Sequence, residues 1–337
     1  MTKDLSIIIP YCVEYPQIAF TVNNLICELR DSDIDYEIIV IDNWCHEVSE
    51  QVTKTKIHNT KDLEPTEVYT KRIQDAGSKY MEDITRIHPQ LKYIKYEKKL
   101  SHWNAKNAGV AASSGKCLWF CDSHCIVSKN ALIKMFYYYK KYYEWLNGTL
   151  HLPLSYMLEA SGKELVYKLV LDLAKGVVHY SFTRYSPISN QMVYKVPCMS
   201  TCGMMMSREL FDLLGGWPEE LGIYGGGENF INFSLAVTGK NINIFKSPPL
   251  YHYASKRGYN WNYTDFHRNR TIATYMYGDK KLADLYVHNI KGRPEVLDSI
   301  YNDITTNVSC VKHRINISKQ QKMTIEEWCA KQQEKKV

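Results

Sequence analysis

Two short, uninterrupted apolar runs near the N-terminus, with a helix-periodic stretch between them, constrain the fold of this chain most strongly. Residues 5–9 (LSIII) form the first run, which ends before Pro10, and residues 37–41 (EIIVI) form the second, which ends before Asp42. Between them, residues 16–30 place apolar side chains at helical spacing. Runs that are apolar on both faces are typical of buried parallel strands, which need helical crossovers. The pattern therefore predicts an α/β protein with a parallel sheet.

The alternation of strands and helices continues along the N-terminal part of the chain. Apolar runs at 91–96 and 117–121 predict two more strands, and residues 103–113 between them are compatible with a helix. Residues 44–90 are polar and weakly patterned, and we interpret them as an irregular or partly helical insertion. Later elements are expected in this order: a helix at 131–146, an antiparallel stretch at 176–206, and helices at 207–214 and 227–238.

The segment 131–146 (ALIKMFYYYKKYYEWL) is rich in tyrosine. Leu132, Met135, Tyr139 and Tyr142 recur at helical spacing, so we expect a helix that packs these side chains on the sheet. A platform on which bases or sugars stack is the alternative interpretation.

Composition excludes several classes of protein. The 337 residues contain no run of 18 apolar residues, so no transmembrane helix is expected. The P-loop pattern GxxxxGK followed by Ser or Thr is absent. Ten cysteines include no CxxC pair, which argues against a structural zinc site, and the lack of a leader pattern predicts a cytoplasmic protein. The net charge of +6 permits a polyanionic partner without requiring one.

Asp122 and His124 stand two residues apart, directly after the strand predicted at 117–121. A carboxylate and an imidazole at the end of a strand reach one cation if the chain turns there, and this pair suits Mn²⁺, or Mg²⁺ less readily. A D-x-H pair is also common in ordinary turns. His252 offers a third ligand, and the combination favours a metal site.

A glycine run, Gly225–Gly227, precedes the helix predicted at 227–238 and brings Glu228 into its first turn. Glycines let a loop approach a ligand closely, and Glu228 would then accept hydrogen bonds from a sugar or an incoming hydroxyl. The alternative is a flexible helix start, at which the carboxylate interacts favourably with the helix dipole.

Taken in order, these motifs resemble those of one enzyme family. LSIIIPY near the start, EIIVIDN at 37–43, NAKNAGVAASSGKCLWFCDSHC at 104–125 and GGGEN at 225–229 are together similar to the GT-A glycosyltransferases. The chain resembles glycosyltransferase family 2 and, more closely, the polypeptide N-acetylgalactosaminyltransferases, which share the DSHC and GGEN strings and a histidine after a segment like SPPLY. RNRTIATYMYGD at 268–279 is similar to the helix that ends their catalytic domain.

The resemblance implies an α/β fold of the GT-A type, with a Rossmann-like, nucleotide-binding mixed sheet flanked by helices. It implies a domain over residues 1–290, divided into a nucleotide-sugar half (1–125) and an acceptor half (126–290), with a C-terminal helical tail (291–337). The implied reaction is sugar transfer from a nucleotide-diphosphate donor, a UDP-sugar by preference, to an acceptor hydroxyl.

The resemblance also assigns roles to single residues. Asp42 matches the acidic position that holds the nucleotide, and Tyr11 lies in the loop beside the base. Lys106 and Asn107 match a basic–polar pair beside the donor. The metal ligands correspond to Asp122, His124 and His252. Glu228 and Asn229 match the pair that faces the sugar and the acceptor.

Two departures from the family patterns bear on the mechanism. Family 2 enzymes commonly have Glu-Asp where Glu228 and Asn229 stand, and the Asp serves as the base for inversion. Asn229 cannot accept a proton, so the sequence favours the retaining stereochemistry of the second group. That group usually has Trp before GGEN, whereas Gly225, after Tyr224, stands here, which implies different contacts to the sugar and the acceptor.

Residues 252–270 (HYASKRGYNWNYTDFHRNR) carry cations, among them Lys256 and Arg257, between aromatic residues. We interpret this segment as a lid that closes over the donor diphosphate. A solvated basic loop is the alternative.

The acceptor is open between a cytoplasmic glycan, a hydroxymethylated base in phage-type DNA and a protein side chain. DNA modification would use the basic charge for phosphates and Trp103, Tyr259 or Trp261 to hold an exposed base. The 26 tyrosines, with many Lys and Asn, are typical of AT-rich genomes such as those of viruses, in which case the enzyme would work in a host cytoplasm.

Two other classes of function compete with sugar transfer. One is a catalytically inactive GT-A fold that serves as a binding module, against which the intact metal and carboxylate residues count. The other is a cysteine nucleophile at Cys121 or Cys125, but the sequence assures neither thiol of a cationic partner.

Overall fold

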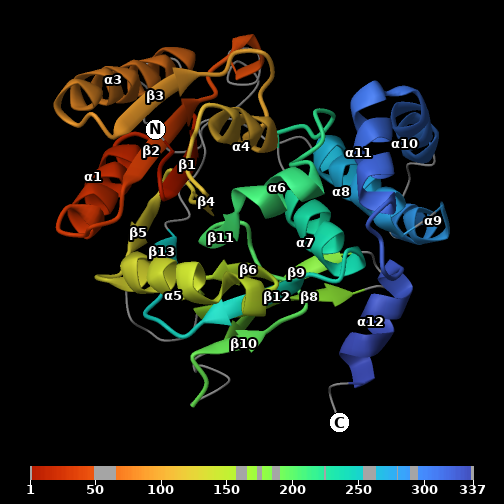
Figure 1. Cartoon of the computed structure of the whole chain (residues 1–337). Coiled ribbons are helices and arrows are strands. Elements are labelled where there is room, and N and C mark those ends of the chain that lie inside the picture. The colour runs from red at the N-terminus through yellow and green to blue at the C-terminus, as the bar shows by residue number, and fades with distance from the viewer. Residues whose placement is uncertain are drawn as a thin grey trace.

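Two mixed β-sheets with helices packed against them form the described part of this computed structural model (Figure 1). The structure describes residues 2–48, 66–156, 165–172, 177–183, 190–223, 225–252, 263–278, 280–288 and 295–334. The larger sheet has the strand order β10-β12-β6-β11-β4-β1-β2-β3, and the smaller one has the order β5-β13-β7-β8-β9. The predicted α/β class is confirmed.

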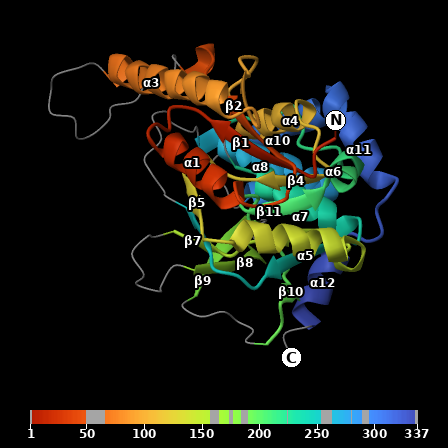
Figure 2. The same ribbon diagram turned by 60° about the vertical axis from the view of Figure 1, so that its left-hand side comes forward.

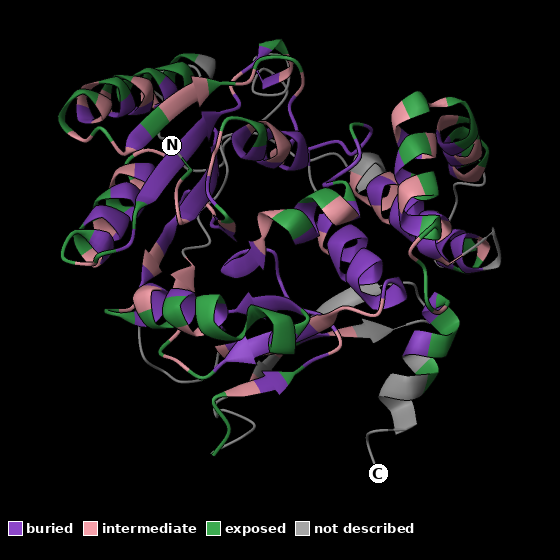
Figure 3. Ribbon diagram, in the orientation of Figure 1, coloured by how far each residue is buried: buried purple, intermediate pink, exposed green. Residues whose placement is uncertain are grey.

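Parallel strands form one half of the larger sheet: β1 (Leu5–Tyr11), β2 (Tyr36–Asp42), β3 (Leu91–Lys95) and β4 (Cys117–Phe120). Every residue of β1 and β2 is buried, which explains their uninterrupted apolar sequence (Figure 3). The helices that connect them are α1 (Gln17–Leu29), α3 (Thr66–Ile87) and α4 (His102–Ala111). The chain moves outward from β1 to β3 and then returns to β4, so right-handed crossovers place α4 on the face opposite α1 and α3.

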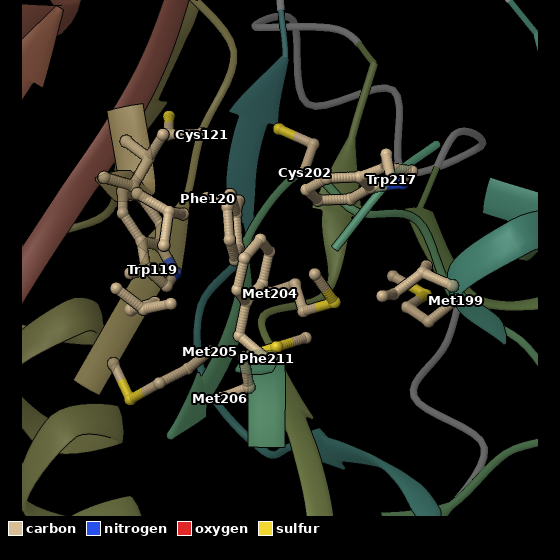
Figure 4. Packing of buried hydrophobic residues seen from close by; sticks show 14 of the residues in the cluster. Trp119, Phe120, Cys121, Met199, Cys202, Met204, Met205, Met206, Phe211 and Trp217 are labelled. Atoms are coloured by element: carbon tan, nitrogen blue, oxygen red, sulfur yellow. The ribbon is translucent and has the colours of Figure 1, made fainter. Parts of the chain in front are cut away.

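The larger sheet continues beyond β4 with strands of both directions. β11 (Met204–Ser207) runs antiparallel to β4, and the further strands are β6 (Gly148–His151), β12 (Asn241–Phe245) and β10 (Val193–Lys195). Met204, Met205 and Met206 are buried beside Trp119 and Phe120 of β4 (Figure 4). The helices of this half, all three of them predicted, are α5 (Ala131–Leu146), α6 (Arg208–Leu214) and α7 (Gly227–Val237).

The smaller sheet joins segments that are distant in the sequence. Its strands are β5 (Cys125–Val127), β13 (Leu250–His252), β7 (Leu154–Ser155), β8 (Leu165–Asp172) and β9 (Val177–Thr183). β13 pairs antiparallel with β5, in a register that sets His252 opposite Cys125. This pairing carries the distal histidine to the end of the D-x-H turn.

The C-terminal residues form helices that pack on the rest of the protein. These helices are α8 (Tyr263–Tyr277), α9 (Lys280–His288), α10 (Glu295–Thr306), α11 (Val308–Ser318) and α12 (Ile325–Glu334). Ile300, Ile325 and Trp328 belong to the same buried core as the sheet. Figure 1 shows α8 to α11 gathered away from α1 and α3, and Figure 2 shows α11 on the opposite side from α3. The boundary at residue 290 stays a prediction. None of the described helices is long and apolar enough to cross a membrane.

The structure refines one sequence-based expectation and corrects another. The polar segment 44–90 contains a long regular helix, α3, whose buried positions include Thr70, Gln74 and Gly77. These positions repeat at helical spacing, but two of them are polar and one is glycine, so hydrophobic periodicity did not reveal the helix. In α5, Leu132, Met135 and Tyr139 are buried as expected, whereas Tyr142 is 37% exposed because the backbone kinks there.

Candidate active site

Asp122, His124 and His252 converge at the carboxyl end of β4. Asp122 and His124 lie in the turn between β4 and β5, and His252 ends β13. The His252 Nε2 atom lies 3.1 Å from Asp122 Oδ2 and 3.1 Å from His124 Nε2. The structure therefore brings together all three residues that the sequence proposed as metal ligands.

The two contacts that His252 makes in this cluster fit a divalent cation. A neutral imidazole carries one N–H, so His252 Nε2 cannot serve both neighbours with a linear hydrogen bond. In an octahedral coordination sphere with bonds of about 2.2 Å, adjacent donor atoms lie about 3.1 Å apart, as the two pairs made by His252 Nε2 do here. The potential ligand atoms at Asp122 that all lie within 4.8 Å of one another are those of Asp122, Cys202 and His252, and His124 joins this group through His252. A cavity of about 10 Å³ lined by Asp122 and His124 is about the size of one water molecule or ion. The carboxylate and imidazole donors suit an ion such as Mn²⁺.

Two further side chains face the Asp122 carboxylate. His102 Nε2 lies 3.4 Å and Lys106 Nζ lies 3.7 Å from Asp122 Oδ1. Burial of Asp122 opposes its ionisation, but the Lys106 ammonium and the hydrogen bonds from His102 and His252 outweigh burial and hold the pKa of Asp122 well below its usual range. Asp122 is therefore ionised, as a metal ligand must be.

Lys106 is fully buried, and its surroundings explain how a lysine is accommodated there. Its ammonium lies 5.2 Å from the ring centre of Trp103 and 5.7 Å from that of Trp217, within the range of cation–π attraction. It also donates a hydrogen bond to Thr201 Oγ1 at 3.2 Å. Two tryptophans and one threonine thus surround the Lys106 ammonium, which faces Asp122.

Glu14 supports His124 from the side away from Asp122. Its Oε1 atom lies 3.6 Å from His124 Nδ1, while its Oε2 atom accepts a hydrogen bond from the Cys12 backbone N–H at 3.0 Å. Ser123 Oγ lies near the same nitrogen, at 3.5 Å. His124 Nδ1 therefore faces a hydroxyl and a carboxylate, while Nε2 points toward His252. Glu14 and His102 were not among the residues predicted from the sequence, because each stands just outside a motif. The one available signal was that each follows a predicted strand, at whose carboxyl end site residues are expected.

Asp42 and Tyr11 end adjacent strands and lie opposite each other in the sheet. The Asp42 carboxylate accepts hydrogen bonds from Gln74 Nε2 at 2.8 Å and from the Trp44 backbone N–H at 2.9 Å, and also from Ser78 and Tyr93. Burial, only partly offset by these hydrogen bonds, raises the pKa of Asp42. The carboxylate is therefore held in a ready-made network of donors.

A cleft of about 370 Å³ opens beside Asp42 and Trp44, along α3. Lys71, Lys79 and Lys95 stand on its walls together with acidic side chains. The Tyr11 hydroxyl faces α3, 3.5 Å from the Gln74 carbonyl oxygen, and Tyr11 also lines the small cavity at Asp122. Tyr11 thus lines the small cavity and contacts Gln74, which lines the larger cleft.

Asn107 makes its described hydrogen bonds with Trp217. Its Nδ2 donates to the Trp217 carbonyl at 2.6 Å, and its Oδ1 accepts from the Trp217 N–H at 3.1 Å. Both ends of the amide are therefore occupied by one backbone unit. In this structure Asn107 fixes the indole that covers Lys106, and its place beside a donor stays a prediction.

The glycine run before α7 is enclosed between two tryptophans and α8. Trp103 Nε1 donates to the Gly225 carbonyl at 3.1 Å, and Trp217 Nε1 donates to the Gly227 carbonyl at 3.2 Å. Gly226 has φ +73°, and a side chain on Gly227 would lie 2.3 Å from the Trp103 ring. These contacts explain the run of glycines and position the first turn of α7.

Glu228 and Asn229 open α7 on the side of the Asp122 cluster. Burial raises the pKa of Glu228, and the charges of Lys106 and Asp122 both act on it, with opposite signs. Asn229 is buried, and its Nδ2 has no hydrogen-bond partner among the residues that the structure describes. A buried amide donor of this kind is costly unless a ligand completes it. Lys256 and Arg257 lie outside the described residues, so their role stays a prediction.

Comparison with known proteins places this arrangement in context. The family model described as glycosyl transferase family 2 matches residues 70–215. Among curated proteins, "Putative polypeptide N-acetylgalactosaminyltransferase 13" of Drosophila melanogaster is 24% identical over 227 residues, which cover 64% of this chain and 38% of the relative. The chain thus spans well under half the length of that relative.

The solved structure of GalNAc-T7 shares the fold. The crystal structure of GalNAc-T7 with UDP, GalNAc and Mn²⁺ superposes with a TM-score of 0.60 at 16% identity, over 91% of this chain and 58% of that one. The structure of S. aureus TarS 1-349 in complex with UDP-GlcNAc gives a TM-score of 0.48 at 12% identity, over 93% of this chain and 79% of that one. The predicted GT-A architecture is confirmed.

Proposed function

We propose that this chain, a GT-A glycosyltransferase that resembles the polypeptide N-acetylgalactosaminyltransferases, transfers a sugar from a UDP-sugar to an acceptor hydroxyl in a metal-dependent, retaining reaction. The convergence of Asp122, His124 and His252 carries the proposal. In α/β sheets, ligands bind at the carboxyl ends of the parallel strands, which is where these side chains meet.

Asp122, His124 and His252 are the residues that would hold the metal, Mn²⁺ in the first place and Mg²⁺ as the alternative. Bound there, a divalent cation supplies positive charge for the diphosphate that leaves with the nucleotide. Glu14 keeps the His124 tautomer that presents Nε2, and Lys106 keeps Asp122 ionised. The buried, partly closed surroundings strengthen each of these charge interactions.

The nucleotide would lie over the carboxyl ends of β1 and β2. Asp42 is the proposed hydrogen-bond acceptor for the base, and Tyr11 is the proposed wall between base and diphosphate. Because Gln74 already donates to Asp42, binding of a base would have to displace or share this contact. Lys256 and Arg257 are proposed to close over the diphosphate.

Glu228 and Asn229 are proposed to face the sugar and the acceptor. The Glu228 carboxylate would accept a hydrogen bond from a hydroxyl group, and the buried Asn229 Nδ2 would donate one. Asn229 has no basic site for a proton, which supports retention over inversion. A carboxyl group whose pKa is raised by burial is suited to hold a proton temporarily during transfer.

For the acceptor we propose a glycan hydroxyl. A net charge of +6 and an isoelectric point of about 8.6 are modest for a protein that binds DNA through its phosphates. A hydroxymethylated DNA base and a protein side chain stay the alternatives. DNA binding would weaken by about 0.9 log units per log unit of salt for every phosphate neutralised, so a flat salt profile would eliminate DNA. The cytoplasmic location also stays a prediction.

Calorimetric titration with UDP, with and without Mn²⁺, tests the proposal. We expect UDP to bind more tightly with Mn²⁺, and Asp122→Asn and His252→Ala to lose this dependence while their circular dichroism is unchanged. His288→Ala, at an exposed position in α9, serves as the matched control. Parental Mn²⁺-dependent binding in either site variant would contradict the metal assignment. Slow, Mn²⁺-dependent release of UDP from a UDP-sugar separates an enzyme from an inactive binding module.

A further inference from the structure

Three buried thiols, those of Cys121, Cys125 and Cys202, meet beside the Asp122 carboxylate. Their sulfur atoms lie within 4.8 Å of one another, and the Cys125 and Cys202 sulfurs are 3.5 Å apart. Each of these residues is at most 2% exposed. Figure 4 shows Cys121 and Cys202 at the same end of the packed core. The proposed sugar transfer uses none of the three.

The backbone holds the three thiols from separate segments. Cys121 and Cys125 flank the D-x-H turn, and Cys202 stands shortly before β11. The N–H groups of all three donate to fixed acceptors: Cys121 to the Ile8 carbonyl at 3.1 Å, Cys125 to Thr21 Oγ1 at 2.9 Å, and Cys202 to Ser200 Oγ at 3.2 Å. The cluster is therefore formed by the fold itself.

The sulfur separations fit three ligands around one ion. With metal–thiolate bonds of about 2.3 Å in a trigonal plane, the sulfurs lie about 4.0 Å apart. The observed separations, from 3.5 Å to less than 4.8 Å, bracket this value. A disulfide, by contrast, requires a separation of about 2.05 Å and would consume two of the three sulfurs.

We propose that Cys121, Cys125 and Cys202 bind one thiophilic metal ion that takes three soft ligands, of which Cu⁺ is the cellular example. Thiolates select such ions over Mn²⁺ and Mg²⁺. Zn²⁺ also binds thiolates, but its structural sites take four protein ligands, and this cluster offers three sulfurs. On binding, three metal–sulfur bonds replace three S–H bonds and the protons pass to solvent, so no oxidant or reductant is consumed.

The proposed thiol site and the Asp122 site meet at Cys202. The Cys202 sulfur lies within 4.8 Å of ligand atoms of Asp122 and His252 as well as of the other two cysteines. The ligand set of the proposed thiol site therefore adjoins that of the proposed Mn²⁺ site through Cys202.

Competition for Cu⁺ tests this site. The reduced, full-length chain is titrated in the absence of oxygen with Cu⁺ held by the chromophoric chelator bicinchoninate. We expect one equivalent to transfer to the protein, with sulfur-to-copper charge-transfer absorption in the near ultraviolet. Cys125→Ser and Cys202→Ser should each weaken binding by more than about 100-fold, since even the hydrogen-bond partners of metal ligands contribute about 10- to 100-fold.

Two controls separate this proposal from the proposed function. Cys27→Ser, at an exposed thiol, and Asp122→Asn should both keep Cu⁺ binding. Parental Cu⁺ affinity in Cys125→Ser, loss of Cu⁺ in Asp122→Asn, or a Cys125–Cys202 disulfide in the purified protein would each overturn the assignment. Copper X-ray absorption can be measured on the unmodified protein, so the result does not depend on whether the variants fold. Three sulfur atoms around the copper would support the site, and any other set of neighbouring atoms would contradict it.

Discussion

Replacement of Lys106 by Met would remove the buried cation that faces Asp122 and leave a side chain of similar length between Trp103 and Trp217. The Lys106 ammonium lies 3.7 Å from Asp122 Oδ1, which corresponds to about 4.5 kcal/mol of Coulomb attraction at an effective dielectric constant of about 20. Without the lysine, Asp122 could become protonated and so avoid an unpaired buried charge. At pH 7 this protonation would cost about 4 kcal/mol, from a usual pKa of about 3.9 and about 1.4 kcal/mol per pH unit. We therefore expect Lys106→Met to lower the free energy of unfolding by about 3 to 5 kcal/mol, the range found when one partner of a buried pair is removed.

Urea denaturation followed by tryptophan fluorescence, at pH 8 with a chelator present, measures this loss. The matched control is Lys140→Met, because Lys140 pairs with Asp4 at 3.2 Å on the surface, where such a pair contributes less than about 1 kcal/mol. The pKa of Asp122 is lowered in the folded protein, so its contribution to stability is present above its unfolded pKa and lost as the pH falls through the folded value. In Lys106→Met this loss should move to higher pH. A cost for Lys106→Met no greater than that for Lys140→Met would refute the reasoning.

Three further predictions concern single buried groups. Burial disfavours the charged form of Glu37, but hydrogen bonds, above all the one from Lys92, outweigh burial and lower the pKa of Glu37 to about 2. The stability that Glu37 contributes is therefore present above pH of about 4.5 and lost toward pH 2. Glu37→Gln should reduce the loss of unfolding free energy in this acid range, and an unchanged loss would contradict the prediction. Gly227→Ala would set a methyl group 2.3 Å from the Trp103 ring and should cost about 1 to 3 kcal/mol, seen as a lower melting temperature; a parental melting temperature would show that the loop has room. Burial lowers the pKa of His151 to about 3, so the free energy of unfolding should fall by up to about 1.4 kcal/mol per pH unit below pH of about 6.5. His151→Gln should remove this pH dependence. If the pH dependence persists in the variant, other groups cause it.

The sequence predicted best the strands that are covered on both faces of the sheet. β1 and β2 are buried at every position, and the centre of each strand is a run of Ile and Val. The bounds of helix α3 were not predicted because the first half of its buried side presents the polar side chains of Thr70 and Gln74, of which Gln74 donates a hydrogen bond to Asp42. Its buried apolar side chains, Met81 and Ile84, lie in the second half, so hydrophobic periodicity covers only part of the helix.

The metal triad was predictable only in part from spacing. Asp122 and His124 are neighbours in the sequence, but the place of His252 depends on the pairing of β13 with β5, which no local pattern encodes. Glu14, His102 and Cys202 act through tertiary contacts of 3 to 5 Å with residues of the motifs and carry no motif of their own. Asn107 shows the converse, because a residue inside a motif makes its contacts with the Trp217 backbone.

Anomalous diffraction from crystals grown with Mn²⁺ and UDP tests the central proposal most directly. We expect one manganese peak within bonding distance of Asp122, His124 Nε2 and His252 Nε2, in contact with the UDP diphosphate. A UDP molecule bound over β1 and β2 with no manganese at these three side chains, or a manganese peak elsewhere on the protein, would contradict it.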